Sequence, residues 1–376
     1  MDSHAPIDHD PWLLTPGPLT TSSTVKQAMM HDFGSRDARF IEINRRVRQQ
    51  LVDIIGGAGS HVCVPLQGSG TFVVEAMLVN FVPANGKLLI LINGAYGTRM
   101  KKICEYHARA VEVLEWPENE PVDAARVDAA LGADPSITHV AVVHCETTTG
   151  ILNPLERISD VVASHGRSLL VDSMSAFGAL LVDCSRLRFD AVVASSNKCL
   201  EGVPGMGFCL ADRTALELSQ GNSDSLCLDL FEQWRGLESS GQWRFTPPTH
   251  CILAFDQALR EFEEEGGVAG RGGRYRRNCD ILVAGMRALG FETLLPDELQ
   301  APIIVTFKMP VDPAFDFQAF YDGLSRLGYV IYPGKLTVAE SFRMGCIGRL
   351  DEAHMHGALA AVEQVMKEMG VTSGAA

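Results

Sequence analysis

The stretch "AVVASSNKCLEGVPGMG", residues 191–207, places a lysine directly after a short apolar run. The run Ala191–Ala194 predicts a buried strand. Lys198 follows at the point where that strand would end, between small polar residues and a glycine–proline loop. Because an ammonium group is costly to bury, Lys198 is either a surface residue on a turn or a lysine that reacts. The rest of the chain has to decide between the two.

Similar apolar runs recur between residues 61 and 212, with amphipathic segments between them. The other runs begin at residues 61, 87, 110, 139, 168 and 207 and read "HVCVPL", "KLLILI", "AVEVLEW", "HVAVVHC", "SLLVDS" and "GFCLAD". Near-continuous apolar strands of this kind are typical of a mainly parallel sheet that helices cover on both faces. The sequence therefore predicts an α/β fold.

The pattern changes at the charged, glycine-rich stretch "REFEEEGGVAGRGGRYRRN", residues 260–278. This stretch is either a domain boundary or a bend within a long linking helix. The segments after it predict helices alternating with short strands, which is typical of a smaller α+β domain. We therefore expect an N-terminal segment (1–15), a large domain (16–262) and a small C-terminal domain (263–376).

Composition narrows the class of protein. The 376 residues carry a formal net charge of −14, which disfavours binding to nucleic acid or to an anionic membrane through bulk charge. The ten cysteines are scattered singly, a pattern that suggests a reducing cytoplasm. The chain start lacks a signal-peptide pattern, and no apolar run is long enough to span a bilayer. His354 and His356 are two residues apart, so we expect no metal site there.

The carboxyl ends of parallel strands form the ligand crevice of an open α/β sheet. The run that begins at residue 61 is followed by Gly68–Thr71 and then by an apolar helix. The segment Gly68–Thr71 is either a phosphate cup or an ordinary tight turn. "NGAYG" delivers Tyr96, which either stacks on a flat ligand or packs in the core. "SLLVD" ends in Asp172, which is either a helix cap or a buried carboxylate that needs a charged partner.

A phosphate cup, a stacking ring, a buried carboxylate and a strand-end lysine together describe a site for pyridoxal 5′-phosphate. That cofactor needs a lysine for its Schiff base and an acid beside its pyridine nitrogen. The order of these groups along the chain fits this cofactor better than any one of them does alone. We therefore predict Lys198 and Asp172 as the catalytic residues.

The same residues carry a family resemblance. The order "GSGT", "NGAYG", "HCETTTG", "VDSMSAFG", "SSNK", "FTPPT" and "FRMG" resembles the small aminotransferases of fold type I, the group that holds alanine:glyoxylate aminotransferases. Within this group, "LLTPGPL", "SSNKCLEGVPG" and "YPGKLT" most resemble 2-aminoethylphosphonate:pyruvate transaminases. The similarity runs from about Pro11 to the last helix. It implies a large domain with a mainly parallel seven-stranded sheet between helices and a smaller α+β domain.

The resemblance also implies a role for each matching residue. Lys198 and Asp172 are catalytic, and Arg343 binds the anionic end of the substrate. Lys335 and Arg36 are further candidates for holding a phosphonate. The residues implied in cofactor binding within one subunit are Ser69, Gly70 and Thr71 at the phosphate, and Tyr96, Thr147, Asp172, Asn197 and Lys198 at the ring. The resemblance also implies a homodimer with shared active sites, in which Thr246 reaches the cofactor phosphate of the neighbouring subunit.

The resemblance implies a reaction in phosphonate catabolism, in which 2-aminoethylphosphonate and pyruvate give phosphonoacetaldehyde and L-alanine. Two other functions stay open. One is an alanine or serine:glyoxylate-type aminotransferase, which has the same cofactor site. The other is a catalytically silent protein that keeps the fold to bind a partner, although the presence of both Asp172 and Lys198 argues against it.

Overall fold

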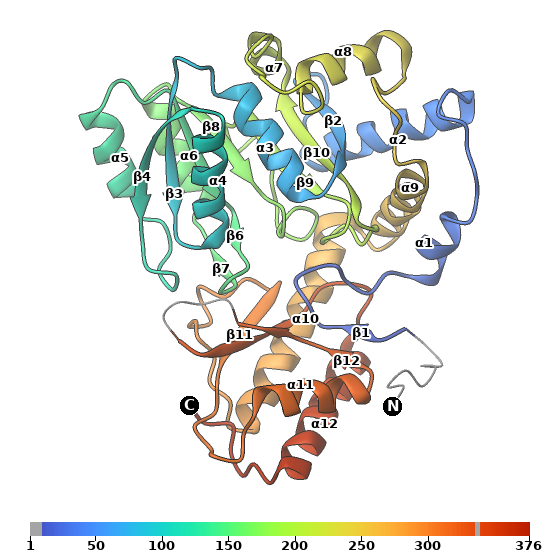
Figure 1. Cartoon of the computed structure of the whole chain (residues 1–376), viewed down its shortest axis with the longest axis vertical. Helices are drawn as coiled ribbons and strands as arrows, with labels where there is room; N and C mark the ends of the chain where they lie inside the picture. The colour runs from blue at the N-terminus through green and yellow to red at the C-terminus, as the bar shows by residue number, and fades with distance from the viewer. Residues whose placement is uncertain (1–9, 335–338) are drawn as a thin grey trace. The chain divides into compact units, whose positions relative to one another are not determined.

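The computed structural model describes residues 10–334 and 339–376, and Figure 1 shows the course of the chain. By their internal contacts the residues form two compact units. The large unit comprises residues 22–146 and 152–271, and the small unit comprises the described part of residues 1–21 together with 147–151 and 272–376. The predicted segment 1–15 lies mostly outside the described residues, and the predicted domain boundaries at residues 15 and 262 stay a prediction.

The large unit contains a seven-stranded sheet in the order β2-β10-β9-β8-β5-β3-β4. Every strand falls within or across one of the seven apolar runs. Strand β10 is antiparallel to both of its neighbours, and the other strand pairs are parallel. The predicted mainly parallel seven-stranded sheet is therefore confirmed. Its strands are β2 (His61–Gly68), β3 (Lys87–Ile92), β4 (Ala110–Glu115), β5 (His139–Val143), β8 (Ser168–Asp172), β9 (Ala191–Ser195) and β10 (Gly205–Asp212).

Helices cover both faces of this sheet, because successive strand residues point to opposite sides. In β8, Leu169 and Val171 belong to one buried cluster and Leu170 to the other. The first cluster packs against α2 (Ala38–Ile54), α5 (Ala124–Ala133), α6 (Leu155–Ser164) and α9 (Thr249–Glu264). The second packs against α3 (Gly70–Phe81), α4 (Ala95–Tyr106), α7 (Arg213–Leu218) and α8 (Leu230–Ser240), and Figure 1 shows both layers.

The remaining elements of the large unit are short. Helix α1 (Ser23–Ala28) begins it, and its N-cap residue Ser22 accepts a hydrogen bond from the backbone N–H of Val25. After β5, the chain forms the two-residue strand β6 (Cys145–Glu146), which pairs with β7 (Ile151–Leu152). This small hairpin brackets the threonines of the "HCETTTG" motif.

The small unit is built on a three-stranded antiparallel sheet in the order β11-β14-β13. Phe307 and Phe342 are paired across the sheet and stack at 5.6 Å between ring centres, within the core that the helices form. The elements of the unit are α10 (Gly267–Ala288, shared with the large unit), β11 (Ile304–Lys308), α11 (Phe317–Arg326), β13 (Tyr332–Pro333), β14 (Ser341–Gly345) and α12 (Glu352–Met369), with β1 (Trp12–Leu13) parallel to β12 (Tyr329–Val330).

The stretch 260–278 contains a break between two helices. Helix α9 ends at Glu264 and α10 begins at Gly267. Gly266 and Gly267 have φ angles of +96° and +65°, values that glycine adopts without steric cost. The bend is therefore made by the glycine pair, and the division between the two units falls a few residues later, within α10.

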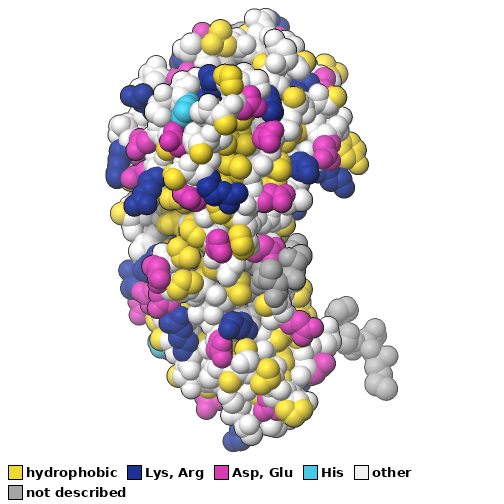
Figure 2. All heavy atoms as spheres, turned by 90° about the vertical axis from the view of Figure 1, so that its left-hand side faces the viewer, with side chains coloured by type: hydrophobic (Ala, Val, Ile, Leu, Met, Phe, Trp, Pro, Cys, Tyr) yellow, Lys and Arg dark blue, Asp and Glu magenta, His cyan; other side chains and the backbone are white. Residues whose placement is uncertain are grey.

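On the face that Figure 2 shows, Lys and Arg side chains are interspersed with Asp and Glu. In the described parts of the chain, no helix has the length and apolar character that a membrane span needs.

Candidate active site

Asp172 and Lys198 follow two neighbouring parallel strands of the large unit. Asp172 is the last residue of β8 and is 3% exposed. Pairing between β8 and β9 sets Asp172 beside Val193, and Lys198 lies just beyond the end of β9 at Ser195. The positive charge of Lys198 acts on the Asp172 carboxylate and lowers its pKa. The structure thus brings together the two residues that the sequence predicts as catalytic.

Burial dominates the electrostatics of Asp172. Removal from water raises the pKa of its carboxyl to about 6, although a hydrogen bond from Met174 and the charges of Arg99 and Lys198 act in the opposite direction. The Met174 backbone N–H donates to Asp172 Oδ1 at 2.9 Å. These groups do not fully compensate the buried charge, so a further cation beside the carboxylate would stabilise it. A protonated pyridine nitrogen is such a cation, and the site fits it.

The loop after β9 fixes the backbone around Lys198. Ser196 Oγ donates to the carbonyl oxygen of Met206 at 3.1 Å, and the Gly202 N–H donates to the Ser196 carbonyl at 2.8 Å. The Glu201 N–H donates to the carbonyl of Lys198 itself, also at 2.8 Å. The lysine therefore extends from a closed, internally bonded loop, with its side chain half-buried.

The residues predicted as a phosphate cup lie at the N-terminus of α3. Ser69 is the N-cap residue, and its side chain makes no capping hydrogen bond. A Cβ atom on Gly70 would lie 2.5 Å from Met174 Sδ, so the loop after β8 packs directly against the start of the helix. A helix N-terminus favours an anion. Together with the hydroxyls of Ser69 and Thr71, it is suited to a phosphate group.

A buried glutamate fixes the start of α4 and with it Tyr96. Glu146 is fully buried, and its Oε2 accepts a hydrogen bond from the Tyr96 backbone N–H at 3.2 Å. A Cβ atom on Gly94 would lie 2.2 Å from Glu146 Cγ, so only glycine fits there. The Arg99 guanidinium lies 4.9 Å from the centre of the Tyr96 ring and donates to Thr71 Oγ1 at 3.2 Å. Tyr96 and the phosphate cup are therefore linked through Arg99.

In the small unit, the structure joins Arg343 to Thr147. Arg343 lies on β14 and is 2% exposed. Its Nη1 donates to the Thr147 carbonyl at 2.8 Å and its Nε to the Pro333 carbonyl at 3.1 Å. These two bonds to backbone carbonyls help to orient the guanidinium. The position of this pair relative to Lys198 stays a prediction.

The remaining predicted residues differ in their solvent exposure. Asn197 is half-buried next to Lys198, and Thr246 is exposed on the segment between α8 and α9. Phe245, beside Thr246, is 50% exposed. Arg36 is exposed, and Lys335 lies outside the described residues.

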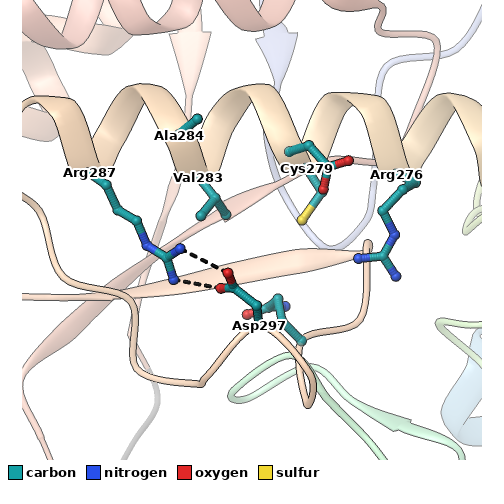
Figure 3. A pocket seen from close by; sticks show the side chains of 8 residues that line it. Arg276, Cys279, Val283, Ala284, Arg287 and Asp297 are labelled. Atoms are coloured by element: carbon teal, nitrogen blue, oxygen red, sulfur yellow. Dashed lines mark hydrogen bonds and ion pairs between the residues drawn. The ribbon is translucent and has the colours of Figure 1, made fainter.

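A separate pocket lies in the small unit along α10, and Figure 3 shows it. It has a volume of about 270 Å³. Arg287 on α10 forms an ion pair with Asp297 at 2.6 Å across this pocket, and Arg276 extends from the same helix. None of the predicted site residues lines it.

Several residues of the site are not among the predicted ones. Arg99 is described above. Arg271 is fully buried, donates to the Cys199 carbonyl of the lysine loop and pairs with Glu265 at 2.6 Å. His144 donates its backbone N–H to the Asp172 carbonyl at 2.8 Å. Each acts through a contact between distant segments, so no local pattern in the sequence marks it.

Comparison with known proteins decides the family. The model of the family described as aminotransferase class-V matches residues 19–320. The chain belongs to this family. The resemblance to aminotransferases seen in the sequence is therefore confirmed, and so is the prediction that the protein is an enzyme of this type.

The chain is also similar to individual curated proteins and to solved structures. The 2-aminoethylphosphonate–pyruvate transaminase of Pseudomonas aeruginosa is 55% identical over 96% of this chain and 97% of its own length. The transaminase of the same name from Cupriavidus taiwanensis is 55% identical over 96% of each chain. The crystal structure of ureidoglycine–glyoxylate aminotransferase from Bacillus subtilis has a TM-score of 0.89 at 22% identity and covers 99% of this chain and 96% of its own, which shows that the fold is shared.

Proposed function

We propose that this class-V aminotransferase transfers the amino group of 2-aminoethylphosphonate to pyruvate with pyridoxal 5′-phosphate as cofactor, and that it serves phosphonate catabolism in the cytoplasm. The observation that carries the substrate assignment is 55% identity, over nearly the whole length, with transaminases of that name. The arrangement of Asp172 and Lys198 supports the cofactor assignment.

The cofactor, when bound, supplies a ring that accepts electrons from the substrate. Asp172 would keep the proton on the ring nitrogen, since its carboxylate gains from a neighbouring cation. Lys198 Nζ would accept the proton that leaves the carbon bearing the donor amino group and would deliver it to the cofactor carbon in the same half-reaction. The second half-reaction would run this proton transfer in reverse. Tyr96 would stack on the ring, and Thr147 and Asn197 would contact it.

The anions of the cofactor and of the substrates would be bound by different groups. Ser69, Gly70 and Thr71 at the start of α3 would hold the cofactor phosphate. Arg343 would bind the carboxylate of pyruvate and the phosphonate of the donor, because a planar guanidinium can bind either group through two parallel hydrogen bonds.

We further propose a homodimer in which Thr246 reaches the phosphate in the neighbouring subunit. Thr246 is exposed next to the half-exposed Phe245, and Phe72, beside Thr71, is 52% exposed. Aromatic residues are enriched at protein interfaces, so the two exposed rings are compatible with the proposal. Sedimentation velocity is expected to give a dimer at assay concentration, and an active monomer would contradict the proposal.

Mixed dimers test the sharing of the active sites. A dimer that pairs a Lys198→Ala chain with a Thr246→Ala chain has one fully intact site if Thr246 acts across the interface. It has none if Thr246 acts within its own chain. Activity per mixed dimer close to half that of the wild type is therefore expected, and activity equal to that of one Thr246→Ala site would exclude the exchange.

An amino-donor screen tests the substrate assignment. 2-Aminoethylphosphonate, alanine and serine are offered at equal concentrations with pyruvate or glyoxylate, and Lys198→Ala serves as the inactive control. The highest kcat/KM is expected for 2-aminoethylphosphonate with pyruvate. A preference for alanine or serine with glyoxylate would assign the alternative aminotransferase, and binding of the cofactor without any turnover would assign a silent protein.

A further inference from the structure

Arg99 touches two parts of the proposed cofactor site and has no role assigned so far. It lies on α4, in the turn that follows Tyr96. Its Nη1 donates to Thr71 Oγ1 at 3.2 Å, and its guanidinium carbon lies 4.9 Å from the Tyr96 ring centre. Its charge also lowers the pKa of Asp172. Three separate interactions therefore place a cation at this edge of the sheet.

The phosphate cup itself consists of neutral donors. Ser69 and Thr71 offer hydroxyls, and the start of α3 offers backbone N–H groups. A phosphate monoester carries close to two negative charges at neutral pH, and the chain has a net charge of −14. Hydrogen bonds from a charged donor are about twice as strong as neutral ones. A guanidinium beside Thr71 would therefore add the positive charge that the neutral donors lack.

The setting of Arg99 also controls its orientation. Residues three apart on a helix share a face, so Tyr96 and Arg99 lie together on α4. The contact with the Tyr96 ring and the hydrogen bond to Thr71 Oγ1 together hold the guanidinium in place. Arg99 is itself exposed, so a ligand can reach its guanidinium.

We propose that Arg99 is a phosphate-binding residue, which holds the phosphate group of the cofactor together with Thr71 while Tyr96 orients its guanidinium. The proposal rests on the proposed function, because it concerns the same cofactor. It assigns the cation of the phosphate site to a residue within the large unit, on the same helix as the stacking ring.

Two ligands that differ only in the phosphate test this role. Pyridoxal 5′-phosphate and pyridoxal are titrated into protein freed of cofactor by dialysis, with tryptophan fluorescence and absorbance as readouts that do not depend on turnover. The Arg99→Met variant is expected to bind pyridoxal 5′-phosphate about 10- to 100-fold more weakly, the range expected for loss of a charge-assisted hydrogen bond. Its affinity for pyridoxal is expected to stay within about twofold of wild type.

Arg126→Met is the matched control. Arg126 is also exposed and also lies over an aromatic ring, with its guanidinium carbon 4.5 Å from the Trp116 ring centre. The control variant is expected to bind both ligands like the wild type. Arg99→Lys keeps the charge and loses the planar fork, so it is expected to fall between Arg99→Met and the wild type.

Three results would overturn the proposal. Equal losses for both ligands in Arg99→Met would mean that Arg99 acts only through the Tyr96 ring. Unchanged affinity for both would mean that it does not bind the cofactor. Unchanged cofactor affinity with a raised KM for 2-aminoethylphosphonate would assign Arg99 to the phosphonate of the substrate. If the wild type itself binds neither ligand, the proposed function fails instead, which separates the two outcomes.

Discussion

Replacing Asp172 with asparagine is expected to stabilise the cofactor-free protein at neutral pH while it weakens function. The side chains have the same shape, and the asparagine Oδ1 can still accept the hydrogen bond from Met174. Only the buried charge is lost. Burial raises the pKa of the Asp172 carboxyl from 3.8 to about 6. Since one pKa unit corresponds to about 1.4 kcal/mol, the ionised carboxylate costs the folded protein about 3 kcal/mol.

The sign of the pH dependence follows from the raised pKa. The folded protein binds this proton more tightly than the unfolded chain does, so the free energy of unfolding falls as pH rises from about 4 to about 6. The asparagine of the variant does not titrate and has no such dependence. The advantage of the variant is therefore expected to be absent near pH 4 and complete above about pH 6. The opposing charges of Arg99 and Lys198 are already included in the raised pKa.

Thermal unfolding of cofactor-free wild type and Asp172→Asn between pH 4 and pH 8 measures this effect. Asp183→Asn is the control, since the pKa of that carboxyl is lowered by hydrogen bonds from Ser185 and its loss is expected to change stability in the opposite direction. A variant that is less stable than wild type at pH 7.5, or a difference that does not change with pH, would refute the reasoning. With cofactor and substrate present, the first half-reaction of Asp172→Asn is expected to slow by about 100-fold or more.

Two further substitutions test other parts of the site. Arg343→Met is expected to lower kcat/KM by about 10- to 100-fold for both 2-aminoethylphosphonate and pyruvate, with the cofactor absorbance unchanged. The two half-reactions, measured separately, check this. A loss on the pyruvate side alone would mean that another residue holds the phosphonate. Gly94→Ala places a methyl group 2.2 Å from Glu146 Cγ. The substitution is expected to lower the free energy of unfolding by about 1 to 3 kcal/mol and to weaken cofactor binding. A denaturation midpoint equal to that of wild type would contradict the packing described at the start of α4.

The strands and the strand-end residues could be predicted because they depend on local pattern. Each apolar run is long enough to specify a strand, although β4, at the edge of the sheet, has no buried residue. The topology of an open α/β sheet then places Asp172 and Lys198 at the same edge. The break at Gly266 was open to two interpretations, since a glycine-rich stretch fits both a boundary and a bend. Its positive φ angle decides the local geometry.

The rest of the site depends on contacts that no short pattern encodes. In the sequence, Arg99 is one more polar residue on the outside of a helix, and only the packing of α3 beside α4 brings it to Thr71. Glu146 follows a strand as many acidic residues do, and its role depends on the missing side chain at Gly94. Strand β1 has only two residues, and its pairing with β12 joins distant parts of the sequence.

The proposed chemistry depends above all on Lys198 being the lysine to which the cofactor is attached. Reduction of the purified protein with borohydride, followed by peptide mass mapping, tests this attachment most directly, because the reduction makes it permanent. We expect a single pyridoxyl label, on the peptide that contains Lys198, and no label in Lys198→Ala. A label on a different lysine, or an equal label in the Lys198→Ala variant, would contradict the assignment.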